Sequence, residues 1–295
     1  MPPSEPAAGV LVAGCGYVGG RLASLMANDG VPVWGLKRDP ASLPAGVRPV
    51  AADVTDPRSL SRGLNGIHPA PAALVYAIAP PGPSADDYQA AYVDGLRSVI
   101  AALPAPPKRL VLVSSTGVYG HADGRWVDED TDPEPADESA RRILDGEDLA
   151  VSGAATGIVL RLGGIYGPGR TRTVRQVLSG EARCPPADRY GNRIHRDDAA
   201  AALRHLLRLD RPHAIYIGVD RDPAPLRDVY AWIARRAGVP DPCEEEEGGP
   251  AGHDPAPGRR GSNKRCSSRR LLESGFAFRY PTYREGYGAL IEELA

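Results

Sequence analysis

The sequence predicts an α/β fold in which a doubly wound parallel sheet, with helices on both faces, is followed by a smaller C-terminal lobe. Short apolar runs alternate with helix-forming stretches through the first two thirds of the chain. This alternation is typical of parallel sheets built from βαβ units. The run LVLV at 110–113 is continuously apolar, as expected of a strand buried on both faces. A glycine-rich turn joins the first apolar run to the first helix.

Strands of the sheet are predicted where apolar residues cluster, at 10–13, 31–36, 47–51, 73–77, 110–113 and 158–162. Helices are predicted between them, at 21–28, 57–64, 86–103 and 139–152. Thr55 or Asp56 is expected to cap the helix that begins at Pro57, because a polar side chain before a proline is typical of a helix start.

The glycine turn Gly14-x-Gly16-x-x-Gly19 follows the first strand directly. This order is the Rossmann fingerprint of a dinucleotide site. Gly14 permits the tight turn, Gly16 lets the backbone approach the pyrophosphate, and Gly19 lets the helix pack close to the strand. The helix start offers N–H groups to the phosphates. We therefore predict that these glycines, with Tyr17 and Val18, bind a nicotinamide dinucleotide.

The pattern changes after Leu162. A loop at 163–169 is followed by helices at 173–179 and from Asp197 or Asp198 to about 209, a strand at 214–219, and helices at 226–237 and 285–294. Residues 241–263 are rich in Pro, Gly and charge and are predicted as a surface loop. We therefore divide the chain into an NADP-binding Rossmann domain at 1–166 and a substrate lobe at 167–295, with about 190–219 packing back on the Rossmann sheet.

The end of the second strand indicates which dinucleotide is bound. NAD-binding units place an acid there to hold the ribose 2′-hydroxyl, whereas Lys37 and Arg38 offer cations suited to a 2′-phosphate. We predict NADP. NAD is the alternative, because Asp39, one position later, could be the acid that holds the ribose hydroxyl. The other interpretation of Lys37 and Arg38 is a solvent-exposed turn without a ligand.

Asp53, Ala77 and Ala79 follow the third and fourth strands and are also predicted to bind the cofactor. Ligands of open α/β sheets collect at the carboxyl ends of the strands. Two roles are open for Asp53: accepting a hydrogen bond from the adenine amino group, or capping the helix at Pro57.

Composition excludes several other classes of protein. A net charge of −2 and 6% aromatic residues argue against binding to nucleic acid or a membrane surface. No apolar run has membrane-spanning length, and the N-terminus lacks the features of a secretory signal. The four cysteines, Cys15, Cys184, Cys243 and Cys266, have no CxxC spacing, so neither a disulfide framework nor a metal site is expected. We expect a cytoplasmic protein that binds a small-molecule substrate, with a homodimer as an assembly the sequence allows.

Three further motifs follow in order. They are SSTGVYG at 114–120, LRLGGIYGPG at 160–169 and RIHRDDA at 193–199. Together with the glycine turn, they resemble the extended short-chain dehydrogenase/reductase superfamily, the NAD-dependent epimerase/dehydratase group. The tail at 263–286 resembles an atypical subgroup. The resemblance covers nearly the whole chain and implies hydride transfer to or from a nicotinamide ring.

The resemblance also implies a catalytic Ser or Thr and a YxxxK pair, in which the Lys lowers the Tyr pKa from about 10. Ser115 matches the serine, with capping of a strand end as its other interpretation. Pro135 and Glu147 match the residues that flank the pair, which places Ser139 at the Tyr position and Ile143 at the Lys position. Neither can perform the expected chemistry, and no YxxxK occurs in the chain.

Three hypotheses follow from this departure. The first is an NADP-dependent oxidoreductase of the atypical short-chain type that acts on a small carbonyl, imine or sugar-like substrate. It would use Ser115 and Tyr119 as catalytic residues, with Arg142 as a nearby charge. The second is a non-catalytic, redox-sensing regulator that binds NADP(H). The third is a nucleotide-sugar epimerase or dehydratase, which the missing pair disfavours.

Overall fold

The computed structural model describes residues 9–244 and 262–294 and divides the chain into two units, which interleave in sequence. Unit 1 comprises Met1–Val118, Asp137–Arg161 and Ala199–Tyr216, and unit 2 comprises Tyr119–Ala136, Leu162–Asp198 and Ile217–Ala295. The division therefore differs from a single boundary at residue 166, because the chain passes between the units several times. Most of the predicted return segment at 190–219 belongs to unit 1.

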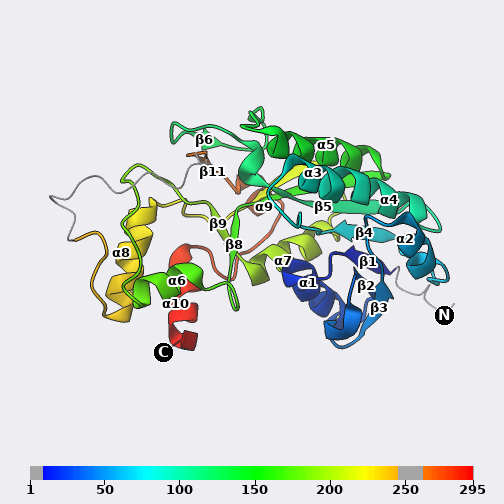
Figure 1. Cartoon of the computed structure of the whole chain (residues 1–295), viewed down its shortest axis with the longest axis horizontal. Coiled ribbons are helices and arrows are strands. Elements are labelled where there is room, and N and C mark those ends of the chain that lie inside the picture. Colours follow the sequence, from blue (N-terminus) through cyan, green and yellow to red (C-terminus); the bar gives the residue numbers. More distant parts are fainter. Residues whose placement is uncertain (1–8, 245–261, 295) are drawn as a thin grey trace. The chain divides into compact units, whose positions relative to one another are not determined.

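A seven-stranded parallel sheet forms the centre of the fold, in the order β10-β7-β5-β4-β1-β2-β3 (Figure 1). Its strands are β1 (Val10–Ala13), β2 (Val33–Lys37), β3 (Val47–Ala51), β4 (Ala73–Tyr76), β5 (Arg109–Ser115), β7 (Thr156–Leu162) and β10 (Ile215–Gly218). The strand β1 is buried throughout and pairs with β2 on one side and β4 on the other. The strand order reverses at this point, where ligands of doubly wound sheets bind. The predicted fold class is confirmed.

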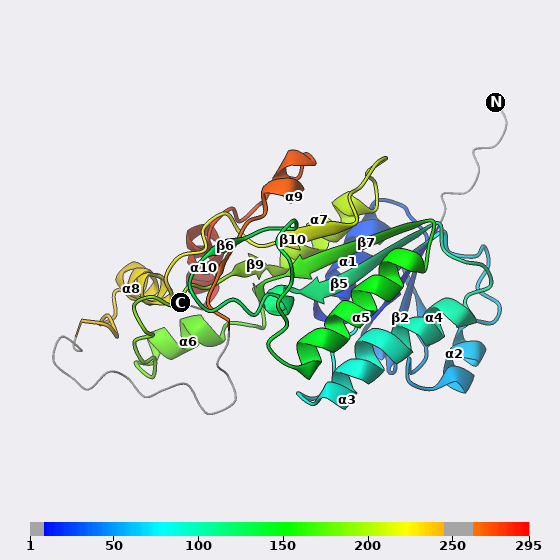
Figure 2. The same ribbon diagram turned by 90° about the horizontal axis from the view of Figure 1, so that it is seen from above.

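Helices cover both faces of the sheet, with α4 and α5 on one face and α1 and α7 on the other (Figures 1 and 2). The regular helices of this part of the chain are α1 (Tyr17–Asn28), α2 (Pro57–Leu64), α5 (Glu138–Ser152) and α7 (Arg196–Leu206). Asp56 caps α2, since its side chain accepts from the backbone N–H of Arg58. Short 3₁₀ turns form at Pro40–Ser42 and Thr116–Val118.

The helix predicted at 86–103 forms in three pieces, α3 (Ala85–Tyr88), a π-helical segment (Gln89–Asp94) and α4 (Gly95–Ala102). The buried Tyr76 hydroxyl donates to the Ala91 carbonyl at 2.5 Å, inside the π-helical segment. Gly95 leaves room for that hydroxyl, because a Cβ there would lie 2.6 Å from it. A side chain inserted into the helical ladder explains the irregular turn.

Unit 2 contains four short strands and four helices among its described residues. The strand β6 (Trp126–Val127) pairs with β11 (Arg265–Cys266), and β8 (Gly164–Tyr166) pairs with β9 (Arg193–His195). The helices are α6 (Arg172–Leu178), α8 (Leu226–Ala237), α9 (Arg269–Glu273) and α10 (Tyr283–Leu294). Apolar residues of α6, α8 and α10 form a core with Tyr166. Strands of two or three residues show no periodicity, so the sequence did not reveal them.

Cys184 and Cys243 form a disulfide across a sequence separation of 59 residues, which corrects the expectation of unpaired cysteines. Their partnership depends on the fold, because it joins the segment after α6 to the segment after α8. Cys15 and Cys266 are free and buried. Most of the predicted loop at 241–263 lies outside the described residues.

Across the described ranges, 9–244 and 262–294, no helix is long and apolar enough to span a membrane.

Candidate functional site

The three glycines of the turn after β1 have different surroundings. Gly14 has a φ of +86°, and a Cβ there would lie 2.5 Å from the Ala77 carbonyl oxygen. A Cβ on Gly19 would lie 2.3 Å from the Gly14 carbonyl oxygen, so only glycine allows this approach of α1 to the turn. A Cβ on Gly16 would meet nothing closer than 4.0 Å. The space beside Gly16 is therefore open, as a phosphate group requires.

The start of α1 is suited to an anion. Gly16 is the N-cap, no side chain caps the helix, and its first turn contains no acidic residue. The first N–H groups of a helix have no acceptor within it, and they carry the positive end of the dipole. Tyr17, Val18 and Gly19 form this first turn. The residues present thus fit a dinucleotide pyrophosphate.

The polar residues at the end of β2 divide into cations and an engaged acid. Asp39 Oδ1 accepts from the Ala41 backbone N–H at 3.0 Å and so caps the turn at Pro40–Ser42. Lys37 Nζ donates to Ser42 Oγ at 3.0 Å. Arg38 is exposed. Asp39, the acid that could hold a ribose hydroxyl, therefore caps the neighbouring turn, and the exposed Arg38 guanidinium lies next to it in the sequence.

Asp53 follows β3 and forms a turn of its own. Its Oδ1 accepts from both the backbone N–H and the hydroxyl of Thr55, at 2.9 and 2.7 Å. These bonds lower the pKa of Asp53, so the carboxylate is ionised at neutral pH. Capping of α2 belongs to Asp56 instead, which overturns that alternative for Asp53. The role of Asp53 toward adenine stays a prediction.

The residues after β4 lie beside the glycine turn. Ala77 donates its N–H to the Ala13 carbonyl at 2.8 Å, which continues the pairing of β4 with β1. Ala79 is exposed two residues further on. The role of Ala77 and Ala79 toward the cofactor stays a prediction.

The two predicted catalytic residues are both engaged in local structure. Ser115 Oγ accepts from the Gly117 backbone N–H at 3.0 Å, as a cap of the strand end. Tyr119 is fully buried, and its hydroxyl donates to the Asp128 carbonyl at 2.7 Å. A phenol in this position stabilises the loop that follows β5. Its catalytic role remains a prediction that requires this bond to break.

The positions that replace the YxxxK pair lie on α5. Ser139 Oγ donates to the Pro83 carbonyl at 3.3 Å, and the Ile143 side chain is buried. Neither side chain offers a group that titrates near neutral pH. Arg142, one residue earlier, forms ion pairs with Glu138 and Asp145 on the same helix.

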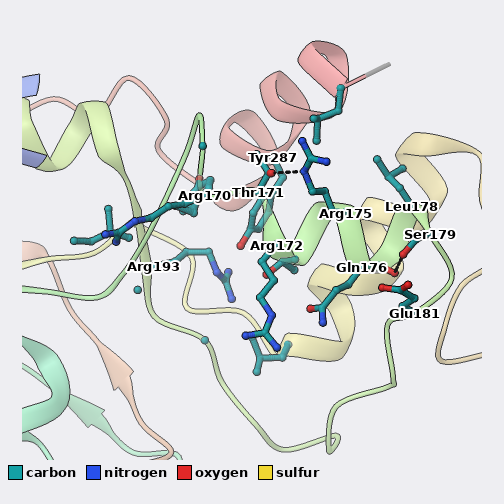
Figure 3. Close-up of a pocket in the computed structure, with 18 of the residues that line it drawn as sticks. Arg170, Thr171, Arg172, Arg175, Gln176, Leu178, Ser179, Glu181, Arg193 and Tyr287 are labelled. Carbon is teal, nitrogen blue, oxygen red and sulfur yellow. Dashed lines mark hydrogen bonds between the residues drawn. The ribbon is translucent and has the colours of Figure 1, made fainter. Parts of the chain in front are cut away.

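Sequence reasoning missed a cavity of about 1180 Å³ within unit 2. Its lining comes from β8, α6, β9 and α10 and includes four arginines, Arg170, Arg172, Arg175 and Arg193 (Figure 3). Glu181 is the one carboxylate of the lining. Arg170, Arg172 and Arg175 lie close together in the sequence, but Arg193 follows 18 residues after Arg175, so no local motif shows that the four share a cavity.

Aromatic side chains surround His195, on β9. Its ring lies 3.9 Å from the Tyr280 ring and 5.4 Å from the Tyr166 ring, measured between centroids. Its Nδ1 accepts from the Asp197 N–H at 3.2 Å. His195 is therefore packed among aromatic rings at the end of β9.

Comparison with known proteins agrees with this geometry. The model of the NAD dependent epimerase/dehydratase family matches residues 10–218. A structure from Methylobacillus flagellatus, named for the NAD-dependent epimerases/dehydratases, is 40% identical, with a TM-score of 0.80 over 97% of this chain and 98% of that chain. A 3-diazoavenalumate denitrifying reductase from Streptomyces is 28% identical over 79% of this chain and 83% of its own length. The human epimerase family protein SDR39U1, solved with NADPH, shares the fold with a TM-score of 0.75 at 20% identity, over 96% of this chain and 99% of that chain.

Proposed function

Because the chain belongs to the NAD-dependent epimerase/dehydratase family, we propose that it is an NADP-dependent oxidoreductase acting on a small carbonyl or imine substrate. The reductase named among its relatives supports a redox reaction. Structures of the same fold contain NADPH, as in human SDR39U1, or NAD, as in MoeE5, which supports a nicotinamide cofactor, and the choice of NADP rests on the end of β2. When bound, the nicotinamide supplies or accepts the hydride.

The observation that carries the proposal is the pairing of an open glycine turn with a cationic end of β2. The turn at Gly14–Gly19 leaves room for a pyrophosphate, and the start of α1 offers N–H groups. Asp39 is used to cap the neighbouring turn, while Arg38 stays exposed. An arginine binds a phosphate through paired, charge-assisted hydrogen bonds. We assign the 2′-phosphate to Arg38, with Lys37 as its neighbour.

The test is a titration of wild type and Arg38→Ala with NADPH and NADH, followed by fluorescence. Loss of a charge-assisted contact weakens binding by roughly 10- to 100-fold, so the variant should lose that much affinity for NADPH. Its affinity for NADH should stay within about threefold. Arg62→Ala, on α2, is the matched control and should change neither value. Equal loss for both cofactors would refute the assignment.

A second function is favoured by the engaged catalytic candidates. The hydroxyls of Tyr119 and Ser139 donate to backbone carbonyls, and Ser115 Oγ accepts from a backbone N–H. A protein that binds NADP(H) without turning over a substrate needs no proton donor, so the arrangement also suits a redox-sensing regulator. NADPH consumption with a panel of aldehydes, ketones and imines separates the two functions. Tight NADPH binding without any consumption supports the regulator.

A further inference from the structure

The arginine cavity of unit 2 contains a charged group that the described structure leaves unsatisfied. Arg193 lies on β9 and lines the cavity with 5% of its surface exposed. Its Nη1 and Nη2 atoms are buried and have no hydrogen-bond partner among the described residues. Buried polar groups are almost always hydrogen-bonded, and an unpaired buried charge is strongly unfavourable. The Arg193 guanidinium therefore requires a hydrogen-bond partner that the described residues do not provide.

The surroundings of Arg193 do not supply that partner. The guanidinium carbon lies 5.4 Å from the centre of the Tyr283 ring, a contact that leaves the N–H edge unpaired. Asp220 donates its backbone N–H to the Arg193 carbonyl at 2.6 Å, but its Oδ2 is itself unpartnered. Burial raises the pKa of Asp220 to about 7 although the nearby Arg193 charge lowers it, so the two groups interact electrostatically, but no hydrogen bond joins Asp220 Oδ2 to the Arg193 Nη atoms.

The charge of the cavity favours the same kind of partner. Arg193 and Arg172 extend toward the same space, whereas Arg170 points away from it (Figure 3). Arg175 already donates its Nε to Thr171 Oγ1 at 2.9 Å. Arginine guanidinium groups recognise planar or tetrahedral anions through paired N–H bonds. Two guanidinium groups extend into this space, and Glu181 is the one carboxylate among the described lining residues, so the cavity attracts negative charge.

We infer that this cavity binds the substrate through an anionic oxygen group, a carboxylate or a phosphate, which pairs with the Arg193 guanidinium. The inference rests on the proposed function, since it names the class of that enzyme's substrate. Gly191 is part of the site, because a Cβ there would lie 2.2 Å from Arg193 Nη2. The glycine thus leaves room for the guanidinium in its observed position.

Calorimetry with three probes of similar size tests this assignment: benzoate, phenyl phosphate and neutral benzamide. At least one charged probe should bind the wild-type chain tenfold or more tightly than benzamide, and the tighter of the two identifies the anion. Arg193→Gln should weaken that probe by about 10- to 100-fold and leave benzamide unchanged, in line with the strength of charge-assisted bonds. Arg235→Gln removes the same charge from an exposed position on α8, outside the cavity lining, and should change binding by less than about threefold.

Gly191→Ala provides a second route, because it moves the guanidinium without removing its charge, and it should also weaken the charged probe. NADPH titration of every variant reports on unit 1 and confirms that the chain is folded. If NADPH binds but no charged probe exceeds benzamide, or if Arg193→Gln and Arg235→Gln have equal effects, the inference fails while the proposed function stands. If the charged probe binds through Arg193 but NADPH does not bind, the proposed function fails, and the cavity loses its assignment as a substrate site.

Discussion

Glu147 occupies a position that the family resemblance marks only as a flank of the catalytic pair, yet it is the centre of a buried network. Its carboxylate accepts from Ser114 Oγ at 2.5 Å and from Arg161 Nε and Nη2 at 3.0 and 2.6 Å. The Arg161 and Glu147 side chains are 3% and 5% exposed. Strands β5 and β7 are thereby fixed to α5 by charge-assisted bonds inside unit 1. Such a network is stabilising only when every member is satisfied.

We expect Glu147→Gln to lower the free energy of unfolding by about 3 to 5 kcal/mol, because it leaves the Arg161 charge buried without a counter-charge. Urea denaturation measures the loss. Glu292→Gln is the matched control, since it breaks an ion pair with Arg236 whose side chains are 68% and 49% exposed. Such exposed pairs contribute about 0 to 1 kcal/mol. A similar loss in both variants would show that burial of the Glu147 pair has no energetic consequence.

At the scale of elements, the close contact of α1 with the glycine turn shapes the predicted cofactor site. The helix starts at Tyr17, and Gly19 and Gly20 stand side by side in its first two turns. Their surroundings differ sharply. A Cβ on Gly19 would lie 2.3 Å from a backbone oxygen of Gly14, whereas a Cβ on Gly20 would lie 3.5 Å from its nearest neighbour, an ordinary contact. The two glycines are therefore a natural pair for comparison.

Gly19→Ala should push α1 away from β1, destabilise the chain by about 1 to 3 kcal/mol and weaken NADPH binding. Gly20→Ala should leave NADPH binding unchanged and raise stability by up to about 1 kcal/mol, because alanine is the better helix former. Thermal unfolding and NADPH titration measure both quantities. Unchanged NADPH affinity in Gly19→Ala would contradict the close-approach argument.

The sequence predicts well the strands of four or more residues and the longer helices, whose apolar pattern is visible along the chain. The strands at Val10–Ala13 and Val47–Ala51 and the helices α2 and α8 begin and end where the pattern places them. The short strands β6, β8, β9 and β11 were not predicted, because pairing across the fold creates them. The π-helical segment also depends on a distant hydroxyl, that of Tyr76.

The candidate site, too, could be predicted only where a sequence pattern marks it. The predicted cofactor residues lie at the carboxyl ends of β1, β2, β3 and β4, so the strand pattern alone places them at one edge of the sheet, whereas Arg193 and α6 meet only in the folded unit 2. The partner of Tyr119 could not be predicted, because a backbone carbonyl leaves no trace in residue identity. Asp39 precedes Pro40 as Asp56 precedes Pro57, which is the sequence pattern of a cap. Position along the chain therefore predicts a cofactor site, whereas the structure was needed to find the arginine cavity.

At the scale of the whole molecule, unit 1 is completed by a segment far along the chain. The helix α7 and the start of β10 belong to it, although residues 162–198 of unit 2 come before them. Arg109, on β5, donates to the carbonyls of Leu207 and Leu209 at 2.6 and 2.7 Å, just after α7. Arg208 also pairs with Asp29, at the end of α1. Both contacts join this late segment to elements of the early sheet.

A fragment of residues 1–166 should therefore fail to form a stable unit 1, even though it contains the whole glycine turn. It lacks α7 and β10, which leaves β7 as an open edge and removes the partners of Arg109 and Asp29. A fragment of residues 1–219 keeps every segment of unit 1 and should bind NADPH within about tenfold of the full chain. Circular dichroism during heating and NADPH titration compare the three proteins. A cooperative transition and full NADPH affinity in the shorter fragment would show that the late segment is dispensable, and that the first 166 residues are a domain in their own right.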